Sequence, residues 1–138
     1  MAKKILKILN HDLTEDQLKG LHDMYGNVQI IELPSHLKDY IVNSPSDEAD
    51  LIDAAKEVAK FIYSPDNRDI IAVIFPAGSP AFQFALYRIL IRYDTFENED
   101  ERKDYLFAHS ERKIIAEKEK DGSVRKTSIF EFKKWIVF

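Results

Sequence analysis

Residues 69–80 read DIIAVIFPAGSP, the strongest structural signal in the chain. The apolar run from Ile70 to Phe75 predicts a β-strand covered on both faces, which is typical of a parallel sheet flanked by helices. A turn at residues 76–78 is expected next, and then a helix with Ser79 as N-cap and Pro80 at its first position. This strand–turn–helix unit predicts an α/β protein.

The helix expected over residues 81–93 is apolar on nearly every side. A helix of this kind is buried on two faces, so its own sheet is not its only neighbour. In a chain of 138 residues, a second copy is the expected other neighbour. The apolar tail from Trp135 to Phe138 also needs a cover, from the core or from a partner. We therefore expect a homodimer.

The residues before this unit predict alternating strands and helices. A short apolar run predicts a strand at 4–9, and the β-branched stretch 28–33 predicts another. Between them, the capping-box residues Thr14 and Gln17 predict a helix over 15–25.

A second helix is expected before the central strand. Apolar residues recur at intervals of three and four from Leu51 to Ile62, which indicates an amphipathic helix lying on a sheet. We expect Ser46 to be its N-cap. Residues 35–43 predict a short helical turn or a loop.

The last third of the chain predicts one more parallel strand and a hairpin. The strand is expected at 105–108 and is followed by a polar loop over 109–113. Segments 114–119 and 124–132 flank Asp121-Gly122, a strong hairpin signal. The whole pattern predicts one domain over residues 1–138: a Rossmann-like open, mostly parallel sheet with a C-terminal antiparallel hairpin at its edge.

Composition excludes several classes of function. The chain has no cysteine, so it has no disulfide, thiolate nucleophile or thiolate metal site, and this suits the cytoplasm. The apolar run near the N-terminus is too short and too interrupted by lysine for a signal peptide or a membrane span. A net charge of -4 argues against duplex DNA as a partner but not against a small nucleotide.

Ligands of open α/β sheets bind beyond the carboxyl ends of the strands, where the strand order reverses. We expect the loops at 10–12 and 76–79 to meet there, with the loop at 109–113 on the same edge. His11 is a candidate general base or ribose ligand, and its alternative role is that of an ordinary loop histidine. Asn10 is a candidate ligand contact, or a residue chosen only for the turn.

Two other groups of residues are candidates for binding phosphate. Gly78 and Ser79 open a helix whose N-terminus favours anions, although a cap alone explains them equally well. Ser110, Arg112 and Lys113 supply a hydroxyl and two cations, or else ordinary surface charge. No pair of histidines has metal-ligand spacing on one helix face, so we predict neither a metal nor a cofactor.

Both ends of the chain resemble one protein family. The stretch NHDLTEDQ, residues 10–17, resembles the NHxLTxxQ-like opening of small stand-alone CRISPR-associated proteins. Near the C-terminus the chain is similar to their S/T-x-R…E…DGSV-x-K…F pattern, at Ser110-Glu111-Arg112, Glu117, Asp121-Gly122-Ser123-Val124, Lys126 and Phe130. These proteins form the CARF group, the CRISPR-associated Rossmann fold. In place of their Gly-rich loop, this chain has PAGSP at 76–80.

The resemblance implies a ring nuclease that switches off type III CRISPR signalling in antiviral defence. Cyclic tetra-adenylate would lie across the two-fold axis of a homodimer, and cleavage would need no metal: a ribose 2′-hydroxyl attacks the adjacent phosphate. It implies that Arg112 or Lys113 stabilises the developing charge and that His11 orients or deprotonates the hydroxyl. Ser79 and Ser110 would contact phosphate or ribose.

Two alternatives remain open from the sequence. In the first, the protein binds the cyclic nucleotide without cutting it, as a sink or a sensor. A receiver-like or flavodoxin-like domain is the other alternative. A receiver needs a phospho-acceptor aspartate after the third strand, where this chain has Phe75-Pro76-Ala77, and a flavodoxin needs a hydroxyl-rich loop where it has residues 10–13, NHDL.

Overall fold

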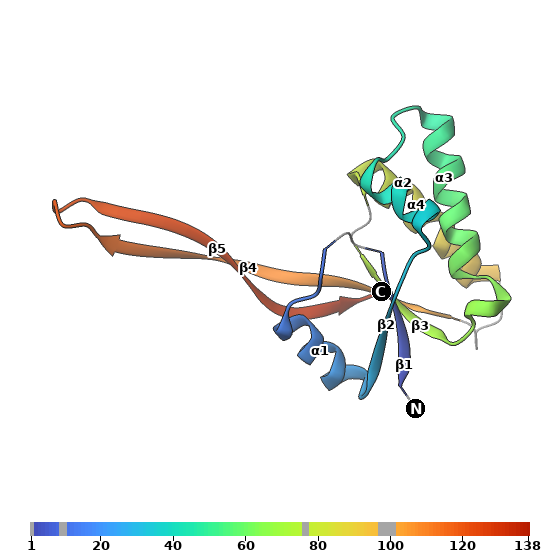
Figure 1. The fold of residues 1–138 in the computed structure, drawn as a ribbon, viewed down its shortest axis with the longest axis horizontal. Helices are drawn as coiled ribbons and strands as arrows, with labels where there is room; N and C mark the ends of the chain where they lie inside the picture. The colour runs from blue at the N-terminus through green and yellow to red at the C-terminus, as the bar shows by residue number, and fades with distance from the viewer. Residues whose placement is uncertain (1, 9–10, 76–77, 97–101) are drawn as a thin grey trace.

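The computed structural model describes residues 2–8, 11–75, 78–96 and 102–138 (Figure 1). Its strands form one open sheet in the order β2-β1-β3-β4-β5. Strands β1 to β4 are parallel, and β5 pairs with β4 in the antiparallel sense. The Rossmann-like, mostly parallel sheet with an antiparallel edge is therefore confirmed. The strand bounds are β1 Lys3–Lys7, β2 Val28–Glu32, β3 Ile70–Phe75, β4 Asp104–Lys118 and β5 Val124–Val137.

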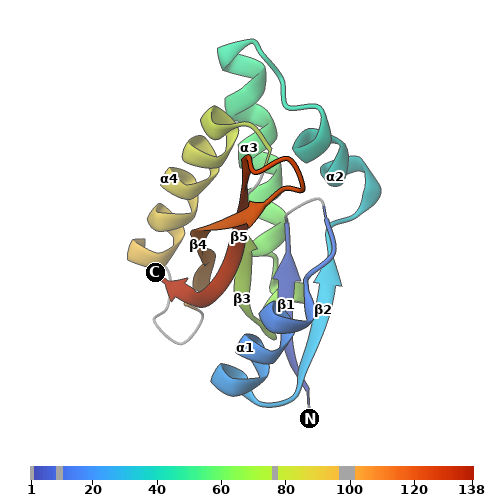
Figure 2. The same ribbon diagram turned by 90° about the vertical axis from the view of Figure 1, so that its left-hand side faces the viewer.

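The helices lie on both faces of the sheet (Figures 1 and 2). Helix α1 (Glu15–Tyr25) covers one face. The other carries α2 (Ser35–Val42), α3 (Glu48–Ile62) and α4 (Pro80–Phe96), and a 3₁₀ turn at Pro65–Asn67 precedes β3. Within the described ranges, no helix is both long enough and apolar enough to cross a membrane.

The helix starts follow the side chains that cap them. The Thr14 and Gln17 capping box of α1 is present, with both side chains bonded to backbone N–H groups. Ser79 caps α4, since its Oγ accepts from the Phe82 N–H at 3.2 Å. The expected cap of α3 is wrong by one residue: Asp47, not Ser46, accepts from the Asp50 N–H. A carboxylate at this place also complements the helix dipole.

Helix α4 is buried on one side and exposed on the other. Phe82, Leu86 and Leu90 are fully buried in the core. The second neighbour of this helix in the described chain is α3, and Phe84 at 64% and Ile91 at 40% remain exposed. The apolar tail, in contrast, begins inside the chain's own core: Trp135 packs on α1 and donates its Nε1–H to the Gln17 carbonyl at 3.0 Å.

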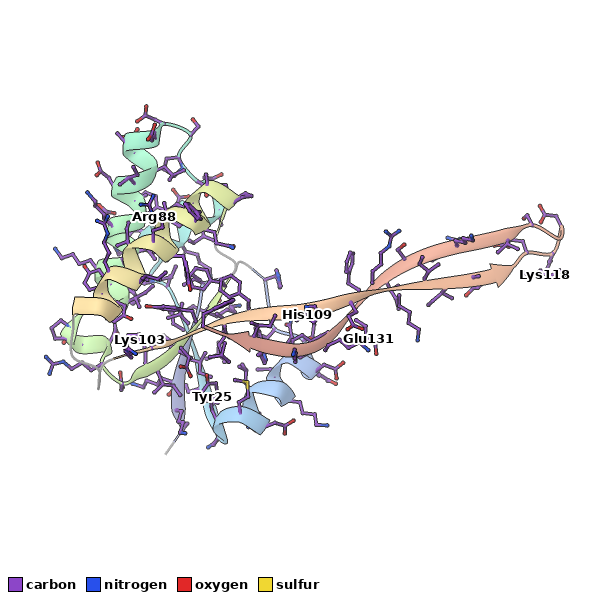
Figure 3. All side chains as sticks on the ribbon, turned by 180° about the vertical axis from the view of Figure 1, so that it is seen from behind. Tyr25, Arg88, Lys103, His109, Lys118 and Glu131 are labelled. Carbon is purple, nitrogen blue, oxygen red and sulfur yellow. The ribbon has the colours of Figure 1, made fainter. Side chains whose placement is uncertain are left out.

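The hairpin is much longer than the sequence suggests. Strand β4 has 15 residues and β5 has 14, so the expected loop at 109–113 is wrong and its residues are part of β4. Beyond Ser110 the two strands leave the sheet together and project from the body as a ribbon (Figures 1 and 3). We call residues 111–131 the arm. Polar side chains lie on both of its faces. The alternation of apolar and polar residues that normally marks a strand in the sequence is therefore missing.

A β-bulge lies where the arm joins the sheet. His109 pairs with Lys134, but the next residue, Ser110, pairs with Phe132, so Lys133 has no partner across the ladder. The extra residue puts Phe132 and Trp135 on the same face although they are three apart, with ring centroids 5.4 Å from each other. Both rings then pack beside Gly20 of α1.

Candidate functional site

The strand order places a switch point between β1 and β3. These two strands are neighbours, yet β1 leads to α1 on one face and β3 leads to α4 on the other. Such points form ligand crevices in open α/β sheets. The described residues just beyond the two strands are His11 and Asp12 on one side and Gly78 and Ser79 on the other. Asn10, also predicted here, lies outside the described residues.

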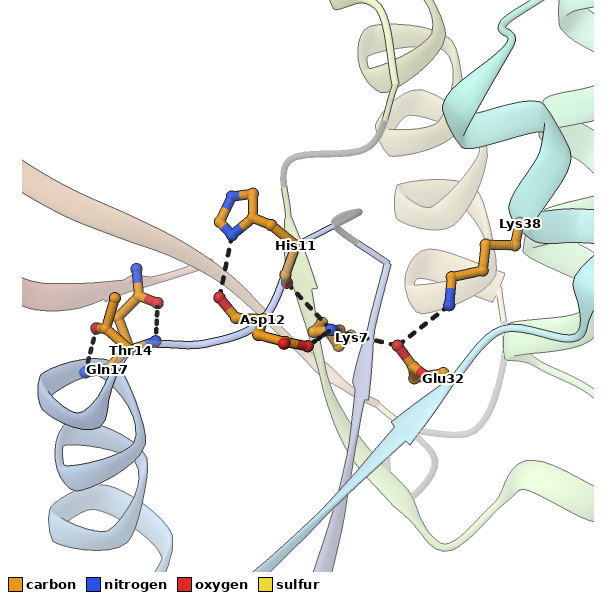
Figure 4. Close-up of polar contacts among 7 residues, drawn as sticks. All are labelled: Lys7, His11, Asp12, Thr14, Gln17, Glu32 and Lys38. Atoms are coloured by element: carbon orange, nitrogen blue, oxygen red, sulfur yellow. Dashed lines mark hydrogen bonds and ion pairs between the residues drawn. The ribbon is translucent and has the colours of Figure 1, made fainter.

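A buried lysine organises the β1 side of the crevice (Figure 4). Lys7, the last residue of β1, is 7% exposed and donates to the His11 carbonyl at 3.0 Å. Its ammonium also pairs with Glu32 at 3.3 Å and with Asp12 at 3.6 Å. Hydrogen bonds from Lys38 and then from Lys7 lower the pKa of Glu32. Two cations therefore face two carboxylates, and their charges cancel.

The His11 ring is exposed, and one contact indicates which of its two nitrogens carries the proton in the neutral form. Its Nδ1 lies 3.1 Å from the Asp12 carbonyl oxygen. Because a carbonyl oxygen only accepts, this contact makes Nδ1 the donor and leaves Nε2 as the basic nitrogen of the neutral ring. Lys7 holds the backbone of the same residue. His11 thus presents its Nε2 to solvent just beyond the carboxyl end of β1.

The α4 side of the crevice is tied to the end of α2. Ser44 donates its hydroxyl to the Tyr40 carbonyl at 3.0 Å and accepts from the Ser79 N–H at 3.1 Å. The Ser79 hydroxyl accepts from the Phe82 N–H, so the capping interpretation of this residue is correct. Its hydroxyl proton remains available, because capping uses only an oxygen lone pair. Ser79 can therefore cap the helix and still donate to a phosphate or a ribose.

Position 78 requires glycine because of its backbone conformation and because neighbouring atoms lie very close. Its φ is +65°, a conformation that L side chains rarely adopt. A Cβ at this position would lie 2.5 Å from the Ser44 Oγ and 3.1 Å from the Ile41 carbonyl oxygen. Gly78 can therefore lie this close to Ile41 of α2 only because it has no side chain.

Gly78→Ala is expected to lower the free energy of unfolding by about 2 kcal/mol, from backbone strain and from the contact with the Ile41 carbonyl. Gly26→Ala is the matched control, since its φ is +80° and a Cβ there meets nothing within 4 Å. Strain alone should cost the control about 1 kcal/mol. Urea unfolding of both variants measures the difference, and equal losses would show that the contact with α2 is unimportant.

The remaining predicted site residues lie on the hairpin and not in a strand-end loop. Arg112 donates Nε–H and Nη2–H to the Ser128 hydroxyl, at 3.0 and 2.8 Å. Lys113 is the next residue of the same strand, so it points to the opposite face of the arm. The two cations therefore cannot serve one ligand from one face. Ser110 lines a shallow pocket of about 290 Å³ between the start of α1 and the base of the arm.

Four residues around this site are not predicted from the sequence: Lys7, Ser44, Glu32 and Lys38. Lys7 had a usable signal, since a lysine closes an apolar strand immediately before the candidate loop. Ser44 had none, because its contact with Ser79 joins residues 35 apart. In the described part of the chain, no group of three or more His, Asp or Glu side chains is arranged to hold a metal ion.

These features define a Rossmann-like α/β protein with a strand-order reversal between β1 and β3 and a long projecting hairpin (Figure 1). The chain belongs to the uncharacterized protein MJ1673 family, whose model matches residues 3–136. No curated protein and no solved structure matches it significantly.

Proposed function

We propose that this protein is a cytoplasmic, homodimeric ring nuclease that binds and cleaves cyclic tetra-adenylate in the crevice between β1 and β3. The observation that carries the proposal is the position of His11, a base on one side of a strand-order reversal, opposite the N-terminus of α4. The stretch that includes His11 is also one of the two that resemble the CARF group.

The chemistry fits the residues present. His11 Nε2 would accept the proton of a ribose 2′-hydroxyl, whose oxygen then attacks the adjacent phosphorus. The bond to the 5′-oxygen breaks, that oxygen takes up a proton, and the products carry a 2′,3′-cyclic phosphate and a 5′-hydroxyl. Ser79 and Ser110 would contact phosphate or ribose, and a cation, Arg112 or Lys113, would stabilise the extra negative charge on the phosphoryl oxygens.

One observation favours a second candidate, binding without cleavage. Among the described residues beside β1, the charges of Lys7 and Lys38 are offset by Asp12 and Glu32. A crevice without a surplus cation stabilises a phosphoryl transition state poorly. In this case the protein would be a sink or a sensor for the cyclic nucleotide.

Only the order of the strands favours the flavodoxin and receiver alternative, since β5 is antiparallel here. The order 2-1-3-4-5 is shared with both groups. The sequence that follows β3 offers no phospho-acceptor carboxylate before α4.

Titration calorimetry with cyclic tri-, tetra- and hexa-adenylate tests the binding. We expect clear preference for the tetra-adenylate and no useful affinity for a duplex DNA control. Incubation of the pure protein with cyclic tetra-adenylate in excess chelator, with the products resolved by chromatography, tests the cleavage. Linear products with cyclic phosphate ends support the nuclease, and an intact bound ring supports the sink or sensor. Equal or absent binding to all three rings contradicts both.

A further inference from the structure

The arm exposes apolar side chains that its own chain leaves uncovered. Phe130 is 75% exposed, Ile114 and Val124 are each 59% exposed, and Ile129 is 41% exposed. Figure 3 shows the arm standing clear of the body, from Glu131 at its base to Lys118 near its tip. A two-stranded hairpin without a packed face is marginally stable in water at best. An arm with this composition therefore needs a covering surface.

Apart from the pocket beside α1 that Ile129, Phe130 and Glu131 line at its base, the described arm is open on both faces and both edges (Figure 3). Arg112, Ile114 and Phe130 share one face, because Arg112 pairs with Phe130 and Ile114 is two residues further along β4. Lys113 and its partner Ile129 lie on the other. Within the described sheet, β3 pairs with β4 only as far as Phe107, so no third strand accompanies the arm. The cover must therefore come from outside the described body.

The charges of the arm indicate what covers it. They are sorted by face. The face of Arg112, Ile114 and Phe130 carries three cations, Arg112, Lys118 and Lys126, and no carboxylate, whereas Lys113 and Arg125 share the other face with Glu111, Glu117 and Glu131. The segment that leads into α1 has the opposite sign, with Asp12, Glu15 and Asp16. A basic face and an acidic segment of the same chain are complementary between two copies, and the net charge of -4 disfavours nucleic acid as the cover.

The direction and length of the arm indicate where it lies on that second copy. At about 3.4 Å per residue, the part of β4 from Glu111 to Lys118 reaches about 27 Å beyond Ser110. The arm leaves on the side of the molecule where the chain enters α1, and Figure 2 shows it from its tip, in front of the carboxyl ends of β1 and β3. If two crevices face each other across a two-fold axis, each arm extends past the axis onto the partner.

We propose that the arm docks on a second copy of this chain and that its Arg112 completes the crevice of that partner. Residues 111–131 match the roughly 20–30 residues that each side contributes to a specific interface. Docking in this way supplies the surplus cation that the described crevice lacks. The location on the partner's crevice rests on the proposed function, whereas the docking itself does not.

Sedimentation equilibrium of Phe130→Asp tests the docking. We expect the wild type to be dimeric at micromolar concentration and the variant to dissociate at least tenfold more readily, because a carboxylate in a covered apolar contact is strongly unfavourable. The control is Met24→Asp, an equally drastic change at a 41% exposed residue in the last turn of α1, and it should leave the dimer unchanged. A monomeric wild type, or equal effects of the two variants, overturns the proposal.

Photo-crosslinking identifies the surface on which the arm lies. Benzoylphenylalanine replaces Phe130 in a chain of normal isotopes, and this chain is mixed with uniformly ¹⁵N-labelled protein. We expect light-to-heavy crosslinks to the segments 11–17 or 78–83, and crosslinks within one chain alone contradict the proposal. Neither experiment uses a nucleotide. A protein that dimerises through the arm but ignores cyclic adenylates refutes only the proposed function. A monomer that binds them refutes the arm and the homodimer, and leaves only the binding of the cyclic nucleotide.

Discussion

Arg112→Ala is expected to slow the cleavage of cyclic tetra-adenylate by about 10³-fold, at the upper end of the loss caused by removing one oxyanion donor. The guanidinium is already oriented, because Ser128 holds two of its N–H groups in the described structure. His11→Ala should cost less, about 10²-fold, since the alignment of the 2′-hydroxyl by other contacts survives the loss of the base. This prediction depends on the proposed function.

Single-turnover rates at saturating enzyme measure this prediction, so that weaker binding is not mistaken for slower chemistry. Arg102→Ala is the control, because Arg102 is an exposed arginine at the other end of β4. Wild-type rates in Arg112→Ala would remove this residue from the mechanism and leave Lys113 or the α4 N-terminus to stabilise the charge. If neither Arg112→Ala nor His11→Ala is slower, the site lies elsewhere.

Mixing the two inactive variants distinguishes action within one chain from action across the dimer. In a mixed dimer, the Arg112→Ala chain offers an intact His11 and the His11→Ala chain offers an intact arm. If the arm acts on its partner, random pairing of subunits restores about a quarter of the sites. No recovery in samples shown to contain mixed dimers would place Arg112 and His11 in the same chain's site.

Lys103→Ala is expected to lower the free energy of unfolding by about 3–4 kcal/mol, the largest loss of stability among the changes considered. Lys103 is only 6% exposed, and its ammonium donates to the carbonyls of Asn67 at 2.8 Å and Ile70 at 2.6 Å. It also lies 5.5 Å from the centre of the Tyr63 ring. Removing the donor takes a buried hydrogen bond from the Ile70 carbonyl and a part-buried one from the Asn67 carbonyl. Loss of a charged donor from a buried acceptor costs more than the bond contributes on balance.

Urea unfolding of Lys103→Ala measures the loss, and Lys4→Ala is the matched control. Lys4 also pairs with an acceptor at 2.6 Å, Asp69, but both side chains are about half exposed. An exposed ion pair of this kind is worth at most about 1 kcal/mol. If Lys103→Ala lowers the free energy of unfolding no more than the control does, the buried ammonium does not hold the turn before β3 to the start of β4.

The sequence predicts the core of the fold because each of its elements carries its own signal. The apolar run Ile70 to Phe75 and the capping box at Thr14 and Gln17 are local features, and the structure confirms both. The cap of α3 was misassigned because Ser46 and Asp47 are both good N-caps, and only geometry separates them. The length of β4 was missed because the arm is exposed on both faces, so no apolar period marks it.

The candidate site was predictable only in part. The order of the strands brings His11 and Ser79 to one edge of the sheet, as the alternation of strands and helices implied. The sequence predicts a loop at Arg112 and Lys113, because a polar run after a short apolar strand normally marks the end of that strand. Burial of Lys7 depends on Glu32, which belongs to the neighbouring strand, and a single sequence does not reveal such pairings.

The bulge at Lys133 sets the bend and twist with which the arm leaves the sheet. Strand β4 runs through this point without an extra residue, because Ser110 pairs with Phe132 directly after His109 pairs with Lys134. Deletion of Lys133 would therefore leave Arg112 and Phe130 on the same face, but it would remove the added bend and twist. In relatives of this chain, the arm can therefore lengthen or shorten at its tip by paired residues while its direction is kept, whereas loss of the extra residue at the bulge changes where the arm points.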